Sequence, residues 1–342
     1  EVRMTPPTAA AVCRGSNVTC NSTCPENSSW DESIYILYTV FYLVIFIPGL
    51  LGNSLGLFIL CRFISKKTKA VIFMINLAVA DLAHVLSLPL RIYYYVNHTW
   101  PFGKAMCLLC FYLKYLNMYA SIAFLMCISL QRCIFLMKPF CAKDWKRRYD
   151  VRISLLVWLV VGACCSPFIL MRSSAGQNSS GCFKDLPTRK LDLRLSVTMM
   201  TFAELCGFVI PLAVIATCTW RIMRSLRRTE TGTMLQDAND KRRALRLVLM
   251  CTVVFLLCFA PYHVNFLFYL MSGQDIITYC PLRYAVRRFH PISLCLASLN
   301  CCLNPFIYYF LTTEFRQQLS RHGSSVIRGR LMSRESASSF RD

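Results

Sequence analysis

Apolar residues gather in seven long blocks that short polar stretches separate. The blocks cover roughly residues 34–61, 70–95, 105–137, 151–171, 196–220, 244–271 and 284–310. Each is long enough for an α-helix to cross the hydrocarbon core of a bilayer, which takes about 20 residues. Because lipid offers the backbone no hydrogen bonds, helix is the state in which one such block can cross it. The pattern predicts an all-α membrane protein, a seven-transmembrane helix bundle.

The polar ends of the chain set the predicted domain limits. Residues 1–33 are polar and rich in Ser, Thr and Asn, and we expect them to form an extracellular glycosylated segment before the seven-transmembrane domain at 34–310. Residues 311–342 begin with a short amphipathic pattern, Glu314–Leu319, and continue with Ser and Arg. Such a composition cannot form a core, so we predict a short cytoplasmic helix and a disordered tail.

The charge pattern orients the predicted bundle. The chain has 38 Lys and Arg against 17 Asp and Glu, and the basic residues form short runs after the first, third and fifth blocks and in the tail. This is the distribution of cytoplasmic loops rather than of a nucleic-acid-binding surface. Glycosylation sequons fall on the opposite predicted side, which would lie outside the cell. They are at Asn17, Asn21, Asn27, Asn97 and Asn178. We therefore expect a multi-pass plasma-membrane protein with an extracellular N-terminus.

Cysteine is frequent, with 20 residues, most of them inside the apolar blocks as small core residues. On the predicted topology six lie outside, in an oxidising compartment that favours disulfides. We expect Cys107 to pair with Cys182 and Cys280 to pair with an N-terminal cysteine. Cys24 is favoured because it is nearest to the first helix, but the residues leave the pairing of Cys13, Cys20 and Cys24 open.

A charged residue in the middle of a membrane helix indicates function, because burying charge in lipid is costly. Asp81 lies in the middle of the second block, and Asn53 and other neutral polar residues lie at similar depth. One carboxylate with several neutral oxygens suits a small cation such as sodium; the alternative is a hydrogen-bonded network without an ion. The predicted sodium ligands are Asp81, Ser121, Asn300 and Asn304, and we expect no other cofactor.

Cations also lie below the outer rim. Arg91 is ten residues beyond Asp81, about 15 Å further outward at helical rise, and Lys114 is seven residues after Cys107. Both are too deep to reach the headgroups, so we predict a cationic cavity that binds phosphate or carboxylate. Aromatic and histidine side chains complete the predicted ligand-binding set: Arg91, Tyr94, Lys114, Tyr115, Tyr119, Arg172, His263, Arg287 and His290.

Other classes of membrane protein fit less well. An odd number of spans without inverted repeats disfavours a transporter or channel. The chain has no HExxH, GxSxG or P-loop pattern, so we do not expect an enzyme.

Several motifs together resemble the class A (rhodopsin-like) G-protein-coupled receptors over nearly the whole chain. They are Gly52-Asn53, Leu77–Asp81, Trp158, Pro211, Cys258–Pro261 and Asn304–Tyr308. The resemblance implies a heterotrimeric G protein and arrestin as partners. It also implies a set of residues that act in activation: Arg132, Phe259, Pro261, Asn304, Pro305 and Tyr308.

The triplet that ends the third helix departs from the family, which has an acid before the Arg and a Tyr after it. Here it reads Gln131-Arg132-Cys133. Because the usual acid is missing, we expect a weaker inactive lock and raised basal signalling.

Within the class, four segments resemble the lysophosphatidylserine receptor group: Cys61–Asn76, Leu88–Tyr95, Cys110–Ser121 and Leu319–Ser325. This implies an anionic lysolipid ligand, lysophosphatidylserine first, with Val161 and Phe168 beside its acyl chain, and coupling through G alpha 12/13. A nucleotide receptor of the purinergic type is the alternative, because a cationic, tyrosine-rich cavity serves both ligands.

Overall fold

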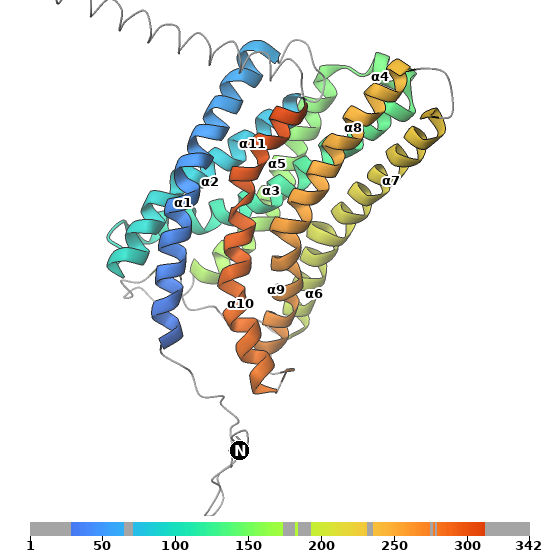
Figure 1. The fold of residues 1–342 in the computed structure, drawn as a ribbon. Helices are drawn as coiled ribbons and strands as arrows, with labels where there is room; N and C mark the ends of the chain where they lie inside the picture. Colours follow the sequence, from blue (N-terminus) through green and yellow to red (C-terminus); the bar gives the residue numbers. More distant parts are fainter. Residues whose placement is uncertain are drawn as a thin grey trace, which may run out of the picture.

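The computed structural model describes residues 29–64, 71–173, 182–183, 193–230, 235–273, 276–277 and 279–311. Figure 1 shows them as a bundle of long helices that run side by side. Within these residues seven helices are long and apolar enough to cross a membrane, which confirms the predicted fold. They are Glu32–Arg62, Val71–Asn97, Gly103–Met137, Arg147–Pro167, Val197–Arg228, Asn239–Ser272 and Cys280–Tyr308.

Some of the seven spans consist of more than one element. In chain order the elements are α1 (Ser29–Ile59), η1 (Leu60–Ile64), α2 (Val71–Asn97), α3 (Gly103–Met137), α4 (Pro139–Asp144), α5 (Arg147–Ser173), α6 (Leu193–Glu204), η2 (Leu205–Val209), α7 (Ile210–Glu230), α8 (Leu235–Val254), η3 (Phe255–Phe259), α9 (Ala260–Gly273), α10 (Cys280–Ser298) and α11 (Asn300–Leu311). The η elements are short π-helical turns.

The helices differ from the apolar blocks mainly at their ends. α7 continues to Glu230 and α8 begins at Leu235, although the apolar blocks stop at about 220 and start at about 244. Helix does not require apolar residues once it leaves the bilayer, and Arg and Lys are good helix formers. α10 begins at Cys280, four residues early, because Pro281 suits the first helical turn. The sequence did not predict α4.

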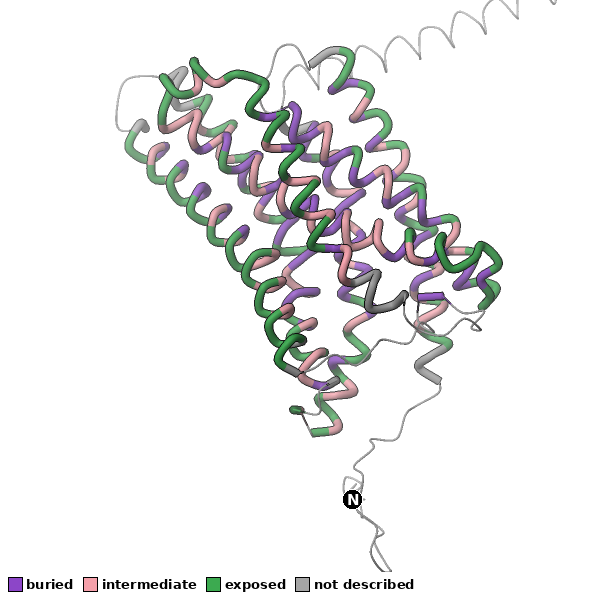
Figure 2. Tube along the Cα trace, turned by 180° about the vertical axis from the view of Figure 1, so that it is seen from behind, coloured by how far each residue is buried: buried purple, intermediate pink, exposed green. Residues whose placement is uncertain are grey.

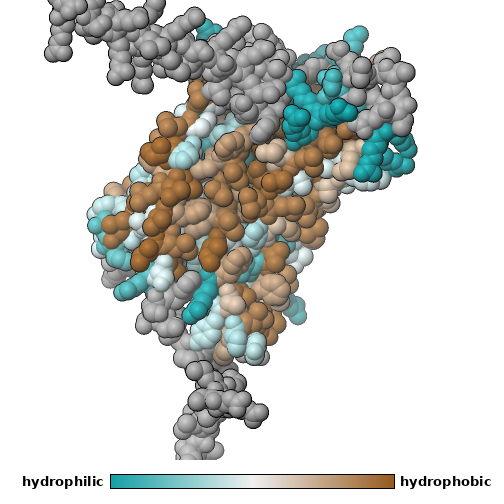
Figure 3. Space-filling model, in the orientation of Figure 1, coloured by the Kyte–Doolittle hydropathy of each residue, from teal (hydrophilic) through white to brown (hydrophobic). Residues whose placement is uncertain are grey.

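α3 lies at the centre of the bundle and packs against α2, α5, α7 and α8. The inward faces of the helices are buried and the outward faces exposed (Figure 2). Much of the outward surface is apolar, and hydrophilic residues gather toward the ends (Figure 3). This distribution of apolar and hydrophilic residues is the one expected of a protein that lipid surrounds.

A hydrogen bond of 2.8 Å from Trp158 Nε1 to Asn76 Oδ1 joins α5 to α2.

Two of the π-helical turns occupy the same place relative to a proline. η2 ends two residues before Pro211, and η3 ends two residues before Pro261. Proline has no N–H to donate to the carbonyl four residues earlier, and its ring crowds that carbonyl. Those carbonyls belong to Gly207 and Leu257, inside the two turns. The widened turns therefore follow from the positions of the prolines.

We call the end of the bundle with Cys107 and Cys182 the disulfide end, and the end with Arg132 the arginine end. Of the predicted glycosylation sites, Asn97 is exposed at the end of α2, and its Nδ2 donates to the Tyr93 carbonyl at 3.0 Å. Other predicted features lie outside the described residues: Asn17, Asn21, Asn27, Asn178, Cys13, Cys20, Cys24 and the tail helix Glu314–Leu319.

Candidate functional site

A polar cluster joins α2, α3 and α11 in the middle of the bundle. Asp81 is completely buried, and Asn117 Nδ2 donates to its Oδ1 at 2.8 Å. Asn304 Nδ2 donates to its Oδ2, also at 2.8 Å. Ser121 Oγ accepts from Asn300 Nδ2 at 2.9 Å. All four predicted residues thus come together, and the structure adds Asn117. Its position four residues before Ser121, on the same helix face, was the signal for it.

The cluster has oxygens to spare. Oδ1 of Asn300 and Oδ1 of Asn304 are buried without a hydrogen-bond partner. Among the described residues, no group of three or more His, Cys, Asp or Glu side chains could hold a metal ion. The donor set is therefore one carboxylate with neutral hydroxyl and amide oxygens, and this set fits a small cation of low charge.

Asn53 lies outside this cluster, and its side chain forms hydrogen bonds with backbone carbonyls. Its Nδ2 donates to the carbonyls of Cys301 at 2.7 Å and of Gly49 at 2.9 Å. The Cys301 carbonyl is the one that Pro305, four residues later, leaves without a helix donor. A Cβ on Gly52 would lie 2.9 Å from Pro305 Cγ, so the glycine lets α1 approach α11 closely enough for this bond.

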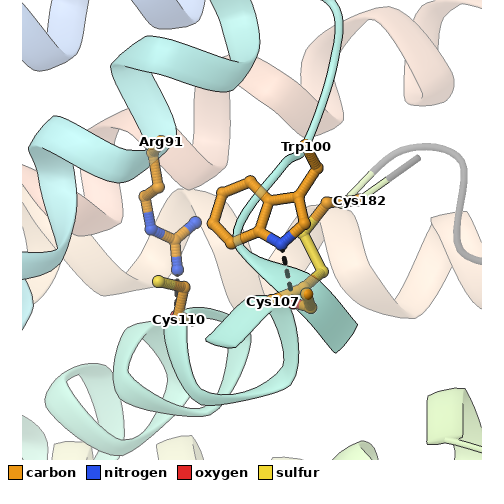
Figure 4. The surroundings of a disulfide bond; sticks show 6 residues. Arg91, Trp100, Cys107, Cys110 and Cys182 are labelled. Carbon is orange, nitrogen blue, oxygen red and sulfur yellow. Dashed lines mark hydrogen bonds between the residues drawn. A yellow bond between two sulfur atoms is a disulfide. The ribbon is translucent and has the colours of Figure 1, made fainter. Parts of the chain in front are cut away.

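At the disulfide end, Cys107 and Cys182 form the predicted bond, with a Cα–Cα distance of 5.9 Å (Figure 4). Cys280 is also in a disulfide. Its predicted partner Cys24 lies outside the described residues. The first bond holds Cys182 at the start of α3, near Trp100 and Arg91 (Figure 4). The following residue, Phe183, contacts both the Trp100 ring and the Arg91 guanidinium.

Arg91 differs from the expectation of an open cavity wall. It is 1% exposed, and one of its terminal nitrogens donates to the Cys110 carbonyl. Its guanidinium carbon lies 4.6 Å from the centre of the Phe183 ring, so the segment held by the disulfide covers it. Tyr94 is also fully buried, and its ring packs against Trp100 and Phe183. In this structure both residues belong to the packing of the disulfide end.

Lys114 lines a cavity inside the bundle. It is half-buried, with Nζ 5.6 Å from the centre of the Tyr38 ring. The cavity is small, with room for about one water molecule. Its lining residues are Lys114, Tyr115, Asn117, Met118, Leu294, Ala297 and Ser298. Since Asn117 also holds Asp81, the cavity connects the predicted ligand residues to the polar cluster.

A second group of predicted ligand residues lies where α3, α6 and α9 meet. His263 Nδ1 is 3.2 Å from both carboxylate oxygens of Glu204, an acid that the predicted ligand set lacked. The Tyr119 ring lies 5.8 Å from the His263 ring, centre to centre. His263 Nε2 is buried without a hydrogen-bond partner. The group therefore contains one buried polar atom without a hydrogen-bond partner.

The remaining predicted ligand residues lie nearer the rim. His290 stacks on Tyr269, with ring centres 4.2 Å apart, and its Nδ1 lies 3.3 Å from Asn265 Nδ2. Arg287 is exposed. Arg172 is in α5, but its side chain lies outside the described residues.

The residues predicted for activation follow the central axis toward the arginine end. Phe259 is fully buried in η3, with its ring 5.9 Å from that of Phe255. Tyr308 is fully buried, and its hydroxyl has no hydrogen-bond partner. A Cβ on Gly56 would lie 2.9 Å from its ring, so Tyr308 packs directly on α1. Arg132 is half-buried at the end of α3.

Comparison with known proteins adds to this geometry. The family model of the 7 transmembrane receptor (rhodopsin family) matches residues 52–308. A relative from Mus musculus that bears the name of a putative purinoceptor, number 10, is 59% identical over 327 residues, which are 95% of this chain and 99% of the relative. "Probable G-protein coupled receptor 174" of Homo sapiens is 50% identical over 89% of this chain and 91% of the relative. "Lysophosphatidic acid receptor 6" of Mus musculus is 33% identical over 90% and 89%.

Proposed function

Since the chain belongs to the rhodopsin family of seven-transmembrane receptors, we propose that it is a plasma-membrane receptor for an anionic lysophospholipid, with lysophosphatidylserine as the first candidate. The same proposal places its N-terminus outside the cell and has it couple through G alpha 12/13 and bind arrestin. The relatives are signalling receptors and not enzymes.

The observation that carries the proposal is Lys114, a half-buried cation on the wall of a cavity inside the bundle. A phosphate or carboxylate is a natural partner for the ammonium group of a lysine that lines a cavity. Tyr115 lines the same cavity. A relative that is 33% identical bears the name of a lysophosphatidic acid receptor, which supports a ligand with one acyl chain and a phosphate.

The outward face of α5 supports a lipid over a nucleotide. α5 packs on α2 and α3, and among the described residues it has at most sparse contact with α6. Leu159 and Val160 of α5 and Phe202 of α6 are all more than half exposed and apolar. An acyl chain would reach the bundle from the bilayer between such faces, whereas a nucleotide needs no apolar side entry.

The ligand assignment is tested by measuring G-protein dissociation in cells that express the receptor. The ligands are oleoyl lysophosphatidylserine, oleoyl lysophosphatidic acid, ATP and UDP, each with a panel of G alpha subunits. We expect lysophosphatidylserine to act at the lowest concentration, with G alpha 13 in the responding set. The name of the 59% identical relative favours a purinergic ligand as the second candidate, and a response to nucleotides alone would establish it.

Lys114 is tested with a matched lysine on the same helix. Lys114→Gln removes the cavity charge, and Lys104→Gln removes an exposed charge at the start of α3. We expect the first change to lower lysophosphatidylserine potency by roughly tenfold or more, the loss of one charge-assisted hydrogen bond, and the second to leave it unchanged. Equal potency in both variants would remove Lys114 from the ligand site.

Activation is a shift between two arrangements of the bundle, since an agonist that binds one of them more tightly raises its population. The proposed moving element is the span of α8, η3 and α9. At η3 the backbone ladder lacks the donor that Pro261 cannot supply, and Phe259 sits in this turn at the centre of the core. Motion there would open the arginine end and expose Arg132 to the G protein.

We also propose that the polar cluster binds sodium. Asp81 would supply the charge, and Ser121 and the free Oδ1 atoms of Asn300 and Asn304 the neutral ligands. We expect NaCl to raise the melting temperature of the purified receptor more than choline chloride at the same ionic strength, because a bound ion stabilises the state that holds it. Asp81→Asn should abolish the difference between the salts; a difference that survives in the variant would place the ion elsewhere.

A further inference from the structure

At the arginine end, one buried carboxylate connects three segments of the chain. Asp150 lies in the first turn of α5 and is completely buried. Its Oδ1 accepts a hydrogen bond of 2.7 Å from Gln131 Nε2 of α3. The same oxygen accepts a second bond of 2.7 Å from Nε1 of Trp145, the residue that follows α4. Asp150 therefore ties both α3 and the end of α4 to α5.

The surroundings of this carboxylate offset part of the cost of burying it. A buried carboxylate is costly unless it is hydrogen-bonded, and two N–H donors and the start of α5 compensate the charge of Asp150. Gln131 is only 4% exposed, and its amide oxygen has no hydrogen-bond partner, so its nitrogen is the atom that anchors it. The rings of Phe135 and Tyr149 flank Trp145 at 5.6 and 5.7 Å between centres.

This contact explains why position 131 carries an amide instead of the acid of the family. An acid there would bring a second carboxylate against Asp150 in a buried site, where like charges repel strongly. Gln131 supplies the N–H donor that the carboxylate needs. The acid is thus present at this end of the bundle, but on α5 instead of α3.

The bonds of Asp150 also bear on the position of neighbouring residues at the arginine end. Arg132 directly follows Gln131, and α4 carries Phe140, whose side chain is 85% exposed. We propose that Asp150 is a positioning residue for the G-protein-facing surface, holding Gln131 and Trp145, and through them Arg132 and α4, in the arrangement that the partner meets. This inference rests on the proposed coupling to a G protein.

A double-mutant cycle at positions 131 and 150 tests the tie. Gln131→Glu sets two carboxylates against each other, and we expect a lower melting temperature and a roughly tenfold loss of lysophosphatidylserine potency in G-protein dissociation. Adding Asp150→Asn exchanges donor and acceptor: the new amide at 150 donates to the new carboxylate at 131, and its oxygen still accepts the Trp145 N–H. The double variant should therefore recover both stability and signalling relative to Gln131→Glu.

A pair of tryptophan variants separates positioning from a merely structural role. Trp145→Phe removes the N–H that bonds Asp150, and Trp158→Phe removes the N–H that bonds Asn76 of α2. Each should lower the melting temperature. Only Trp145→Phe should lower G-protein dissociation per receptor at the cell surface, since Trp158 does not touch the α4 segment.

The melting temperatures are measured on purified receptor without ligand or G protein, so they test the tie even where the proposed ligand or coupling fails. A double variant as unstable as Gln131→Glu would overturn the tie. Recovery of stability without recovery of signalling would overturn the positioning role. Agonist-free signalling that stays low in the double variant, although its stability recovers, would overturn the positioning role and show instead that an acid at 131 acts through Arg132.

Discussion

Two polar side chains in the membrane spans donate to a backbone carbonyl that a proline leaves without its helix donor. Asn53 does this across two helices for Cys301, four residues before Pro305. Ser166 does it within α5, where its Oγ donates to the Ala163 carbonyl at 2.7 Å, four residues before Pro167. A carbonyl in the membrane has no water to bond, so these side chains allow prolines where a helix must bend.

Replacing Asn53 tests this role. Asn53→Ala leaves the Cys301 carbonyl buried without a donor, and we expect it to lower the free energy of unfolding by about 1–3 kcal/mol. The measurement is thermal unfolding of the purified receptor in detergent. Thr198→Ala is the control: it removes a 2.8 Å bond to the Arg194 carbonyl on an exposed face of regular helix and should cost far less. Equal losses would contradict the special role of Asn53.

At the scale of elements, the π-helical turns bring side chains into contact that regular helices would hold apart. In η2, a Cβ on Gly207 would lie 2.6 Å from Cε1 of Tyr119 and 3.7 Å from Cε1 of His263. The turn therefore uses a residue without a side chain to let α3 and α9 meet the backbone that follows Glu204. The turn before Pro211 and the predicted ligand residues Tyr119 and His263 are therefore in direct contact.

Gly207→Ala should disturb that group. The added methyl overlaps the Tyr119 ring, and overpacking of this kind costs about 1–3 kcal/mol. We expect a lower melting temperature and a lower potency of lysophosphatidylserine. Gly162→Ala is the matched change, because its Cβ would meet the Tyr112 hydroxyl at 3.2 Å, the far end of a side chain, and should cost less. Unchanged potency in Gly207→Ala would separate Tyr119 and His263 from the ligand.

At the scale of the whole molecule, the disulfide between Cys107 and Cys182 holds a segment of the chain against Arg91. Phe183 has φ 53°, a left-handed backbone conformation that a bulky residue adopts only when its surroundings hold it there. The neighbouring disulfide and the stacking of Phe183 on Tyr95 and over Arg91 hold it. The segment Cys182–Phe183 thus covers Arg91 and leaves Lys114 as the cation on the wall of the cavity.

Removing the disulfide should therefore lower ligand binding as well as stability. Cys107→Ser is expected to lower the free energy of unfolding by about 2–5 kcal/mol, the usual effect of removing a native disulfide. It should also release Phe183 and reduce ligand binding at the disulfide end. Cell-surface expression, thermal unfolding and the lysophosphatidylserine response are the measurements. Cys295→Ser is the control, since Cys295 is a free, buried cysteine of the same hydrophobic cluster; a control variant no more stable than Cys107→Ser would contradict the prediction.

The sequence by itself determined the number, approximate limits and type of the membrane helices. The length and apolar composition of each block are enough to predict a membrane helix, and they do not depend on any other part of the chain. It also identified Asp81, Ser121, Asn300 and Asn304, since buried polar residues in such blocks are conspicuous. Only the tertiary structure showed which hydrogen bonds join these groups, and it added Asn117 to them. Asp81 and Asn304 are 223 residues apart, and Gln131 and Asp150 are 19 apart on different helices. Such partners depend on how the helices rotate and approach one another, and apolar composition does not record this. For that reason the sequence predicted Arg91 in a ligand cavity, whereas the folded chain covers it with Phe183. The bond from Gln131, the residue before Arg132, to Asp150 was likewise not predicted.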